Sequence, residues 1–580
     1  MTDDREVRPQ RRVEVLLDLW VLVPVVVLCW PLLVRGGYPF SRDLVFTPHL
    51  PLRPEALGLG TGSPRAAPLD AVVAVLSTVV DGAVLGRVAV VLVLAAAGWA
   101  AHRVVRGLGT PARVLAGALA VWNPFVVERL GLGQWALLAG YASLFGLVAA
   151  LRPRDEPGLG RLGRVAPWLA LGALTPTGAL LVGSGVVVLG VRRRKDLPLL
   201  ALAALVQVPW LAPALLGGAS GVSDPAAVAA FAARSERTGP AVLSLLGLGG
   251  IWDGQSVPGS RAGWLGHVTT VLVVVVLAAS ARRGRGSLPA PSLWVWGTGA
   301  FVVAGLTTVG PVADVVAGLT GAVPGLGLLR DGQKCLAPFV VLVVVAAAVA
   351  SDRALVTVRR RAAVLAPTAL LLVVVAPFVV LPDATVVVHR VLRPVEYPAE
   401  LSRAAEVVAR DPGLLASAPW RLYRHYAWAG PYATYDPASR WFDTRVVTSD
   451  DLVLGDRVVA GEDPLAAAVA AVLARPGTAT AAELAGLGVQ WVLVARDDPG
   501  APALLAALTG TSGVVPAVDD PALALLRLPA PDAGAAASLV VPGWQVVSVA
   551  VVDVTVALVL LVVSLAGSTR GRRERSVTVA

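Results

Sequence analysis

An aspartate near the N-terminus is the first residue whose type and position suggest chemistry. Asp43 ends a short polar stretch, Tyr38 to Asp43, nine residues beyond the first membrane-length apolar run, 14 to 34. Because an extended chain advances at most ~3.6 Å per residue, Asp43 lies within about 30 Å of the membrane edge. A carboxylate there can serve as general base toward a lipid-borne substrate. The alternative is a solvated loop aspartate paired with Arg42.

A second polar group lies between two later apolar runs. Glu128 and Arg129 follow Asn123, and Gln134 comes shortly after them. The tryptophans beside these residues are typical of an aromatic belt at a membrane surface. An arginine is disfavoured on the non-cytoplasmic side, so a function there is one explanation for Arg129. A local Glu128–Arg129 ion pair is the other.

A third group leads directly into an apolar run. Arg330, Asp331 and Lys334 are closely spaced, and on a helix Arg330 and Lys334 would share one face. Two like charges four residues apart cost a few tenths of a kcal/mol, which a bound anion would reverse. The pair suits a phosphate or pyrophosphate. Helix capping and lipid-headgroup contact are equally compatible with it.

An aromatic stretch in the C-terminal part offers a fourth candidate. Trp420, Tyr423, Tyr426 and Trp428 belong to an aromatic stretch, 420 to 443, that is interleaved with Arg421, Arg424, Asp436 and Asp443. Aromatic faces beside polar groups suit sugar binding, and we predict acceptor contacts from these four residues. The commoner use of such residues is in a domain core.

The elements that must position these residues are membrane helices. The chain is 56% hydrophobic and 15% charged, against about 45–50% and 25% in soluble domains. We therefore predict a polytopic α-helical membrane protein with about ten to twelve transmembrane helices. Candidate spans are 14 to 34, 84 to 101, 112 to 127, 134 to 151, 166 to 191, 197 to 216, 264 to 281, 291 to 310, 335 to 351, 362 to 381 and 544 to 567.

The net charge of +10 indicates topology rather than nucleic-acid binding, because the arginines cluster between apolar runs. The clusters include Arg11 and Arg12, 192 to 195, 282 to 285, 359 to 361 and 570 to 575. All can be cytoplasmic if 166 to 191 crosses an even number of times. Thr175 to Gly178 would break that segment into two short spans or a re-entrant hairpin. Both termini are then cytoplasmic in a multi-pass plasma-membrane protein.

Four stretches should face outward: 35 to 83, 217 to 263, 311 to 334 and 382 to 543. We predict a multi-spanning domain at 1–384, an extracytoplasmic α/β domain at 385–540, and a final helix with a basic tail at 541–580. Within the α/β domain, 400 to 410 has helical spacing, and 481 to 495 indicates a helix, a glycine turn and a buried strand. Val386 to Val388 suggests a short strand.

Acidic residues are rare inside the predicted spans. Asp18 and Asp553 are the exceptions, either as part of an ion or proton relay or as interfacial and packing carboxylates. Glycine-rich phosphate loops, nucleophile elbows and metal-ligand spacings are missing from the sequence.

This organisation resembles the GT-C class of membrane glycosyltransferases. The resemblance lies in the many spans, the acidic residue in the first outer stretch and the C-terminal outer α/β domain. It implies that Asp43 acts as base and that Arg330 and Lys334 contact the phosphate of a polyprenyl-phosphate sugar donor. Many members carry paired acids at this place, whereas Asp43 stands between Arg42 and Leu44. The arginine-rich, lysine-poor composition resembles that of actinobacterial proteins.

The resemblance implies a cell-envelope glycosyltransferase acting on a glycan or lipid acceptor. The predicted substrate contacts are Arg42, Asn123, Glu128, Arg129, Gln134, Arg330, Asp331 and Lys334. No cofactor is assigned; a divalent metal is compatible with the resemblance, without assigned ligands. Two alternatives remain, a lipid or polysaccharide transporter or flippase and a non-catalytic envelope-assembly protein.

Overall fold

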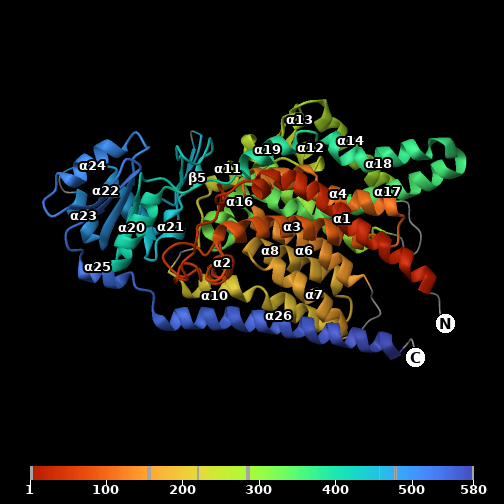
Figure 1. The fold of residues 1–580 in the computed structure, drawn as a ribbon, viewed down its shortest axis with the longest axis horizontal. Helices are drawn as coiled ribbons and strands as arrows, with labels where there is room; N and C mark the ends of the chain where they lie inside the picture. Colours follow the sequence, from red (N-terminus) through yellow and green to blue (C-terminus); the bar gives the residue numbers. More distant parts are fainter. Residues whose placement is uncertain are drawn as a thin grey trace.

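The computed structural model describes residues 4–152, 158–218, 221–281, 288–455, 457–475, 477 and 480–577, with side chains from 12 to 569 within these ranges. A helical body carries a sheet domain at one end (Figure 1). We call this end of the helical body the sheet end. The final helix runs back along the body to the opposite end, where both chain termini lie (Figure 1).

The helical body consists of apolar helices of membrane-spanning length. Seven spans within the described residues are long and apolar enough to cross a membrane. They are built from α1 (Asp4–Val34), α3 (Gly82–Val104), the consecutive α4 (Thr110–Val121) and α5 (Pro124–Gly131), α14 (Trp264–Ala281), α17 (Ala337–Arg361), α18 (Ala366–Val380) and α26 (Gly543–Val577).

Bent and shorter helices account for the other predicted spans. The α9 (Leu197–Leu205) and α10 (Val208–Leu216) pair bends by 46°, and α15 (Pro291–Gly305) and α16 (Gly310–Ala322) meet at 91°. Counting each pair as one span gives nine. Shorter apolar helices are α6 (Trp135–Leu151) and α8 (Pro176–Gly185) with its π-helical extension η1 (Val186–Gly190). The polytopic helical fold is confirmed.

The predicted break in segment 166 to 191 is present. α7 (Leu159–Gly172) stops before it, and α8 starts at Pro176 with Thr175 as its cap, whose Oγ1 accepts from the Gly178 amide at 3.1 Å. A side chain on Gly178 would collide with the Gly172 carbonyl oxygen. The segment is therefore two short helices packed against each other.

The stretch 311 to 334 is helical in its first half, which α16 fills. The stretch 217 to 263 folds into short helices: α11 (Ala226–Ala230), α12 (Ala241–Leu246) and α13 (Gly259–Ala262). The first outer stretch holds the hairpin of β1 (Phe40–Ser41) and β2 (Leu44–Val45), followed by α2 (Leu69–Ser77). Of these segments, α2, α11 and α16 lie toward the sheet end (Figure 1).

The sheet domain has three layers. Its five-stranded sheet has the order β10 (Val515–Asp519), β11 (Leu523–Arg527), β9 (Val489–Ala495), β3 (Leu414–Ala418), β6 (Val446–Val447). β3 is parallel to β6 and β9, whereas β9, β11 and β10 are antiparallel. One face packs on α22 (Pro464–Leu473), α23 (Thr480–Gly486) and α24 (Ala501–Thr509), the other on α20 (Ala399–Arg410) and α21 (Ala438–Trp441).

The sequence predictions for this domain are mostly met. Segment 400 to 410 is α20, and 481 to 495 is α23, a turn at Gly488 and β9. The prediction of a strand at Val386 to Val388 is wrong, because these residues belong to α19 (Ala384–Val391). This helix packs on α1 and α5. The predicted boundary at 385 thus falls inside α19. α25 (Ala533–Ser538) precedes α26.

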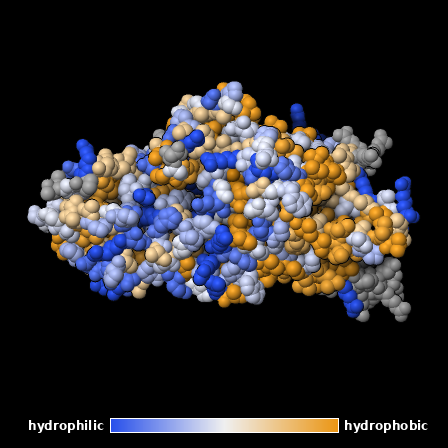
Figure 2. Space-filling view, turned by 90° about the horizontal axis from the view of Figure 1, so that it is seen from above, coloured by the Kyte–Doolittle hydropathy of each residue, from blue (hydrophilic) through white to orange (hydrophobic). Residues whose placement is uncertain are grey.

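The surface supports a membrane location. Apolar residues gather over the half of the molecule formed by the helical body, whereas the sheet domain is mostly hydrophilic (Figure 2). Large exposed apolar side chains occur along α1, α14, α18 and α26, for example Leu16, Val275, Leu371 and Leu558. Exposed valine and leucine are stable in hydrocarbon and costly in water. The chain is therefore a multi-pass membrane protein.

Orientation across the membrane remains a prediction. Of the basic clusters used to predict it, 282 to 285 lies outside the described residues, as do the side chains of Arg11 and 570 to 575. The basic end of α17, Arg359 to Arg361, leads into a turn before α18.

The orientation can be tested with two single cysteines placed in a variant lacking Cys29 and Cys335. Ala409→Cys lies exposed on α20 of the sheet domain, and Gly107→Cys occupies an open position in the turn after α3. A membrane-impermeant maleimide should label Ala409→Cys in intact cells and Gly107→Cys only after permeabilisation. The reverse pattern would place the sheet domain in the cytoplasm.

Candidate active site

Asp43 sits in the turn of the β1–β2 hairpin. Ser41 pairs with Leu44, so Arg42 and Asp43 form a two-residue connection. The Asp43 amide donates to the Leu132 carbonyl at 3.1 Å, which ties the turn to the loop between α5 and α6. Gly133 makes this approach possible: it has φ +77°, and an added Cβ would lie 2.6 Å from the Leu44 nitrogen. The hairpin is thereby held against the end of α5.

The Asp43 carboxylate is oriented by two neutral donors. Gln134 Nε2 donates to Oδ2 at 2.9 Å, and the Tyr423 hydroxyl donates to Oδ1. Tyr423 belongs to β4 (Tyr423–Arg424), so the sheet domain contributes directly to this site. Burial and the negative charge of Asp43 raise the pKa of Tyr423 well above its usual value. Tyr423 therefore remains protonated and continues to donate at physiological pH.

A buried ion pair continues the same network. Arg129 Nη1 donates to Gln134 Oε1 at 2.8 Å, and its two Nη atoms contact Asp331 Oδ2 and Oδ1 at 2.7 and 2.9 Å. Both side chains are almost completely buried. Burial by itself raises the pKa of Asp331, but Arg129, then Lys334 and Arg330, lower it below its usual value overall. Asp331 is consequently a carboxylate at neutral pH.

The predicted cation pair lies next to these groups. Arg330 and Lys334 are not on one α-helix: a 3₁₀ segment, η6 (Gly332–Leu336), separates Arg330 from α17, which starts at Ala337. Lys334 Nζ nevertheless lies 3.8 Å from Asp331 Oδ2 and within electrostatic range of Asp43. Arg330 is likewise within range of Tyr423. The prediction that Arg330 and Lys334 share a helix face is wrong. Both cations nevertheless lie near the contact between Asp43 and Tyr423.

A further cation, Arg65, joins Arg330. The carboxylate of Glu462, from the sheet domain, lies 3.1 Å from Arg65 Nη2 and 3.8 Å from Arg330 Nη1. Burial, then the charge of Arg65, lowers the pKa of Arg330 to about 10, so Arg330 is still protonated at neutral pH. Nothing in the sequence distinguishes Arg65 from its neighbour Arg53 in the first outer stretch.

Glu128 faces away from Arg129, into a separate buried cluster. Glu128 Oε2 accepts from the Ile251 amide and from Gln333 Nε2, both at 3.2 Å. The local Glu128–Arg129 pair is therefore not formed, because each residue has other partners. Glu128 is fully buried, and its contacts with Ile251 and Gln333 support the site structurally.

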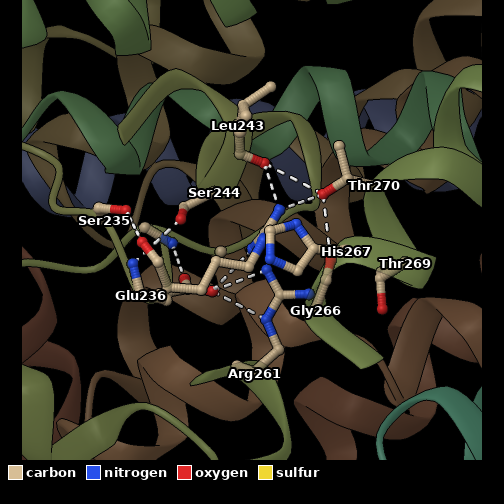
Figure 3. Close-up of polar contacts among 12 residues, drawn as sticks. Ser235, Glu236, Leu243, Ser244, Arg261, Gly266, His267, Thr269 and Thr270 are labelled. Atoms are coloured by element: carbon tan, nitrogen blue, oxygen red, sulfur yellow. Dashed lines mark hydrogen bonds and ion pairs between the residues drawn. The ribbon is translucent and has the colours of Figure 1, made fainter. Parts of the chain in front are cut away.

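The centre of this cluster is an ion pair in the stretch 217 to 263 (Figure 3). Arg261 contacts Glu236 Oε2 through Nε at 2.9 Å and Nη2 at 2.7 Å. The Glu236 amide donates to Ser244 Oγ at 3.1 Å (Figure 3). A side chain on Gly249 would collide with both Glu128 and Glu236. The cluster fixes this stretch against α5 and the start of η6.

Two predicted substrate residues, Asn123 and Arg42, have hydrogen-bond partners within the protein. Asn123 caps α5: its Oδ1 accepts from the Val126 amide at 3.1 Å, and its Nδ2 donates to the Leu119 carbonyl at 2.7 Å. Arg42 points away from Asp43 and contacts Asp253 and Gln255 at 2.6 and 2.9 Å. The predicted Asp43–Arg42 pair is therefore replaced by the contacts of Asp43 with Gln134 and Tyr423.

The four residues of the aromatic stretch have different roles. Only Tyr423 contacts Asp43. Trp428 stacks on Phe40, with ring centroids 5.0 Å apart, and Tyr426 lies 5.8 Å from the same ring. Trp420 packs against the core of the sheet domain. Most of the predicted acceptor residues thus join the sheet domain to the hairpin or lie in a core.

The carboxylates near Asp43 have partners within the protein. In the described part of the chain, no three His, Cys, Asp or Glu residues gather closely enough to hold a metal ion. Both carboxylate oxygens of Asp331 accept hydrogen bonds from Arg129. Asp331 is therefore already paired and does not offer a second carboxylate beside Asp43.

The two acidic residues singled out within the predicted spans, Asp18 and Asp553, have surroundings of their own. Asp18 contacts His102 at 2.9 Å and Arg103 at 3.2 Å, as expected of a packing carboxylate. Asp553 lies in α26 with no hydrogen-bond partner among the described residues.

Comparison with solved structures finds arabinofuranosyltransferase AftD from Mycobacteria. One AftD structure matches 88% of this chain at 19% sequence identity with a TM-score of 0.56, and a mutant form matches 88% at 16% with a TM-score of 0.50. The chain spans about two fifths of AftD's length, 40% and 41% respectively. No family model matches the chain, and neither does any curated protein. AftD is of the GT-C class, so the predicted resemblance is confirmed for the fold.

The Arg129–Asp331 pair gives a test of how the site is held. Asp331→Leu should destabilise the protein by about 3–5 kcal/mol, because it leaves a buried arginine without its anion. The double variant Arg129→Met/Asp331→Leu should recover much of this loss. Thermal unfolding in detergent, followed by size-exclusion chromatography, measures both. A double variant as unstable as the single one would show that the pair does not determine the stability.

Proposed function

We propose that this protein is a cell-envelope glycosyltransferase that moves a sugar from a polyprenyl-phosphate donor to a glycan or lipid acceptor at the sheet end. The observation that carries the proposal is the position of Asp43, oriented by Gln134 and Tyr423, beside the cations Lys334 and Arg330. The likeness of the fold to AftD supports it and favours an arabinofuranosyl group as the transferred sugar.

Asp43 is the general base of the proposed reaction. It takes the proton of the acceptor hydroxyl while that oxygen bonds to the anomeric carbon of the sugar. The bond from the anomeric carbon to the phosphate oxygen breaks, and its electron pair leaves with the phosphate. Gln134 and Tyr423 keep the carboxylate in one orientation during this step. A well-placed base contributes about 10²–10⁴-fold to the rate.

The charge balance of the site suits this donor. Arg65, Arg129, Arg330 and Lys334 are four cations, and Asp43, Asp331 and Glu462 are three carboxylates. Among these groups the cations outnumber the carboxylates, which favours a negatively charged donor. Negative charge on the phosphate increases as the sugar leaves. The cations therefore stabilise the transition state more than the bound donor.

The general-base role predicts that Asp43→Asn abolishes transfer. The substitution is nearly isosteric, so folding, membrane insertion and donor binding should persist while the rate falls by about 10²–10⁴-fold. Transfer of labelled sugar from a polyprenyl-phosphate donor in proteoliposomes measures the rate, and retention of labelled donor measures binding. Asp498→Asn, in a turn before α24, is the matched control. Full activity of Asp43→Asn would exclude this mechanism.

The phosphate role predicts a different pattern for the cations. Arg330→Ala and Lys334→Ala should weaken donor binding as well as the rate, because a cation contacts the phosphate before and during the reaction. Arg403→Ala, on exposed α20, is the control and should change neither. Unchanged donor binding in both site variants would remove the phosphate site. An inactive parent with every polyprenyl-phosphate donor tried would favour a non-catalytic assembly protein.

A further inference from the structure

Arg42 has an unusual backbone conformation beside the proposed base. Its φ is +55°, in the left-handed region that favours glycine. In the described residues only Leu248 shares this property among non-glycine residues. A side chain held in this region persists only when its surroundings determine it, and such residues concentrate at functional sites. The conformation of Arg42 therefore needs an explanation from its contacts.

The backbone of Arg42 is held by the sheet domain. Its amide donates to Thr434 Oγ1 at 3.1 Å, and its carbonyl accepts from the Tyr435 amide at 3.0 Å. Thr434 and Tyr435 form β5, which pairs with β4, the strand that carries Tyr423. The turn at Arg42 and the hydroxyl that reaches Asp43 are thus fixed by one hairpin.

The side chain of Arg42 is held by the stretch 217 to 263. Nη1 lies 2.6 Å from Asp253 Oδ2, Nη2 donates to Gln255 Oε1 at 2.9 Å, and the guanidinium lies 4.2 Å from the centroid of the Tyr432 ring. Asp253 Oδ2 also accepts from Ser256 Oγ at 2.6 Å. These contacts occupy both terminal nitrogens of Arg42, and its side chain is only 9% exposed.

The anchor of Arg42 is itself rigidly placed. The Ile251 amide, two residues before Asp253, donates to buried Glu128, and the Gly250 amide donates to Glu236. Glu236 is paired with Arg261 in the cluster of Figure 3. The same cluster includes Gln333, two residues from Asp331. One buried cluster thus fixes both the partner of Arg42 and the segment that carries the site's ion pair.

We infer that Arg42 is a positioning residue for Asp43 and not a ligand of the substrate. Its guanidinium, held by Asp253 and Gln255, keeps the hairpin turn in the left-handed conformation that directs the Asp43 carboxylate to Gln134 and Tyr423. This inference rests on the proposed function, because it assigns Arg42 a part in the same reaction. It also makes a prediction about the position of Asp43 that does not depend on activity.

The kinetic consequence is a loss of rate without a loss of donor affinity. Arg42→Ala should lower kcat by about 100-fold, the effect of a misplacement of about 1 Å, and leave KM for the donor within about twofold. Asp253→Asn should act in the same direction, and Arg42→Ala/Asp253→Asn should be no slower than Arg42→Ala alone. In an Asp43→Asn background, Arg42→Ala should cause no further loss. A substrate-binding arginine would instead raise KM in the parent background and weaken retention of labelled donor in both backgrounds.

Chemical labelling of Asp43 tests the inference without turnover. A water-soluble carbodiimide with an amine modifies accessible carboxylates, and mass spectrometry of the purified full-length protein gives the rate at Asp43. Arg42→Ala and Asp253→Asn should increase this rate severalfold, because the carboxylate loses its fixed contacts. Arg403→Ala should leave it unchanged. If Arg42→Ala does not fold, Asp253→Asn decides the outcome, since it keeps the arginine and removes only its anion.

The two proposals fail in different ways. An inactive parent whose Asp43 labelling increases in both variants would contradict the glycosyltransferase function and support the positioning role. An active parent whose variants show unchanged Asp43 labelling, with a raised KM and an unchanged kcat, would overturn the positioning role and make Arg42 a substrate ligand.

Discussion

The buried pairing of Arg129 with Asp331 is the interaction on which the rest of the site depends. It joins the end of α5 to the segment that enters α17, two parts of the chain 202 residues apart. Two charges removed from water are tolerated only with good geometry and additional hydrogen bonds. Gln134 supplies one such bond and uses its other group to hold Asp43. The position of the proposed base thus follows from a charge pair that does not itself react.

The depth of the site was predictable from the sequence, and its lateral arrangement was not. Arg129 and Lys334 lie next to an apolar run and Asp43 lies nine residues beyond one, so the hydrophobic pattern predicted that all three lie near the ends of helices. Contacts such as Asp43 with Tyr423 depend on how the helices are arranged around the bundle and on where the sheet domain docks. Neither the arrangement of the helices nor the docking position of the sheet domain can be predicted from the spacing of residues within one segment. Arg65 and Glu462 were missed for this reason.

Local signals explain some of the differences. Asn123 is followed by Pro124, a pair typical of a helix start, which favours capping over a substrate contact. Lys334 lies in the 3₁₀ segment η6, which begins at Gly332 after Arg330, so the two cations are not on one α-helix. In the sheet domain, by contrast, helical spacing and a glycine turn predicted α20, α23 and β9. There, local pattern and final structure agree because each element covers its own part of the core.

The contact between Tyr423 and Asp43 joins residues 380 positions apart in the chain. The partners of Arg42 include the carboxylate of Asp253 and the β-strand residue Thr434. During synthesis, the N-terminal hairpin therefore leaves the ribosome long before these partners exist. The site cannot be complete until residue 435 has been made and the sheet domain has folded beside the first helices. A chain that ended between Asp331 and Tyr423 would contain the acid, the glutamine and the ion pair, yet it would lack the contacts of Tyr423 and Thr434 that orient the base.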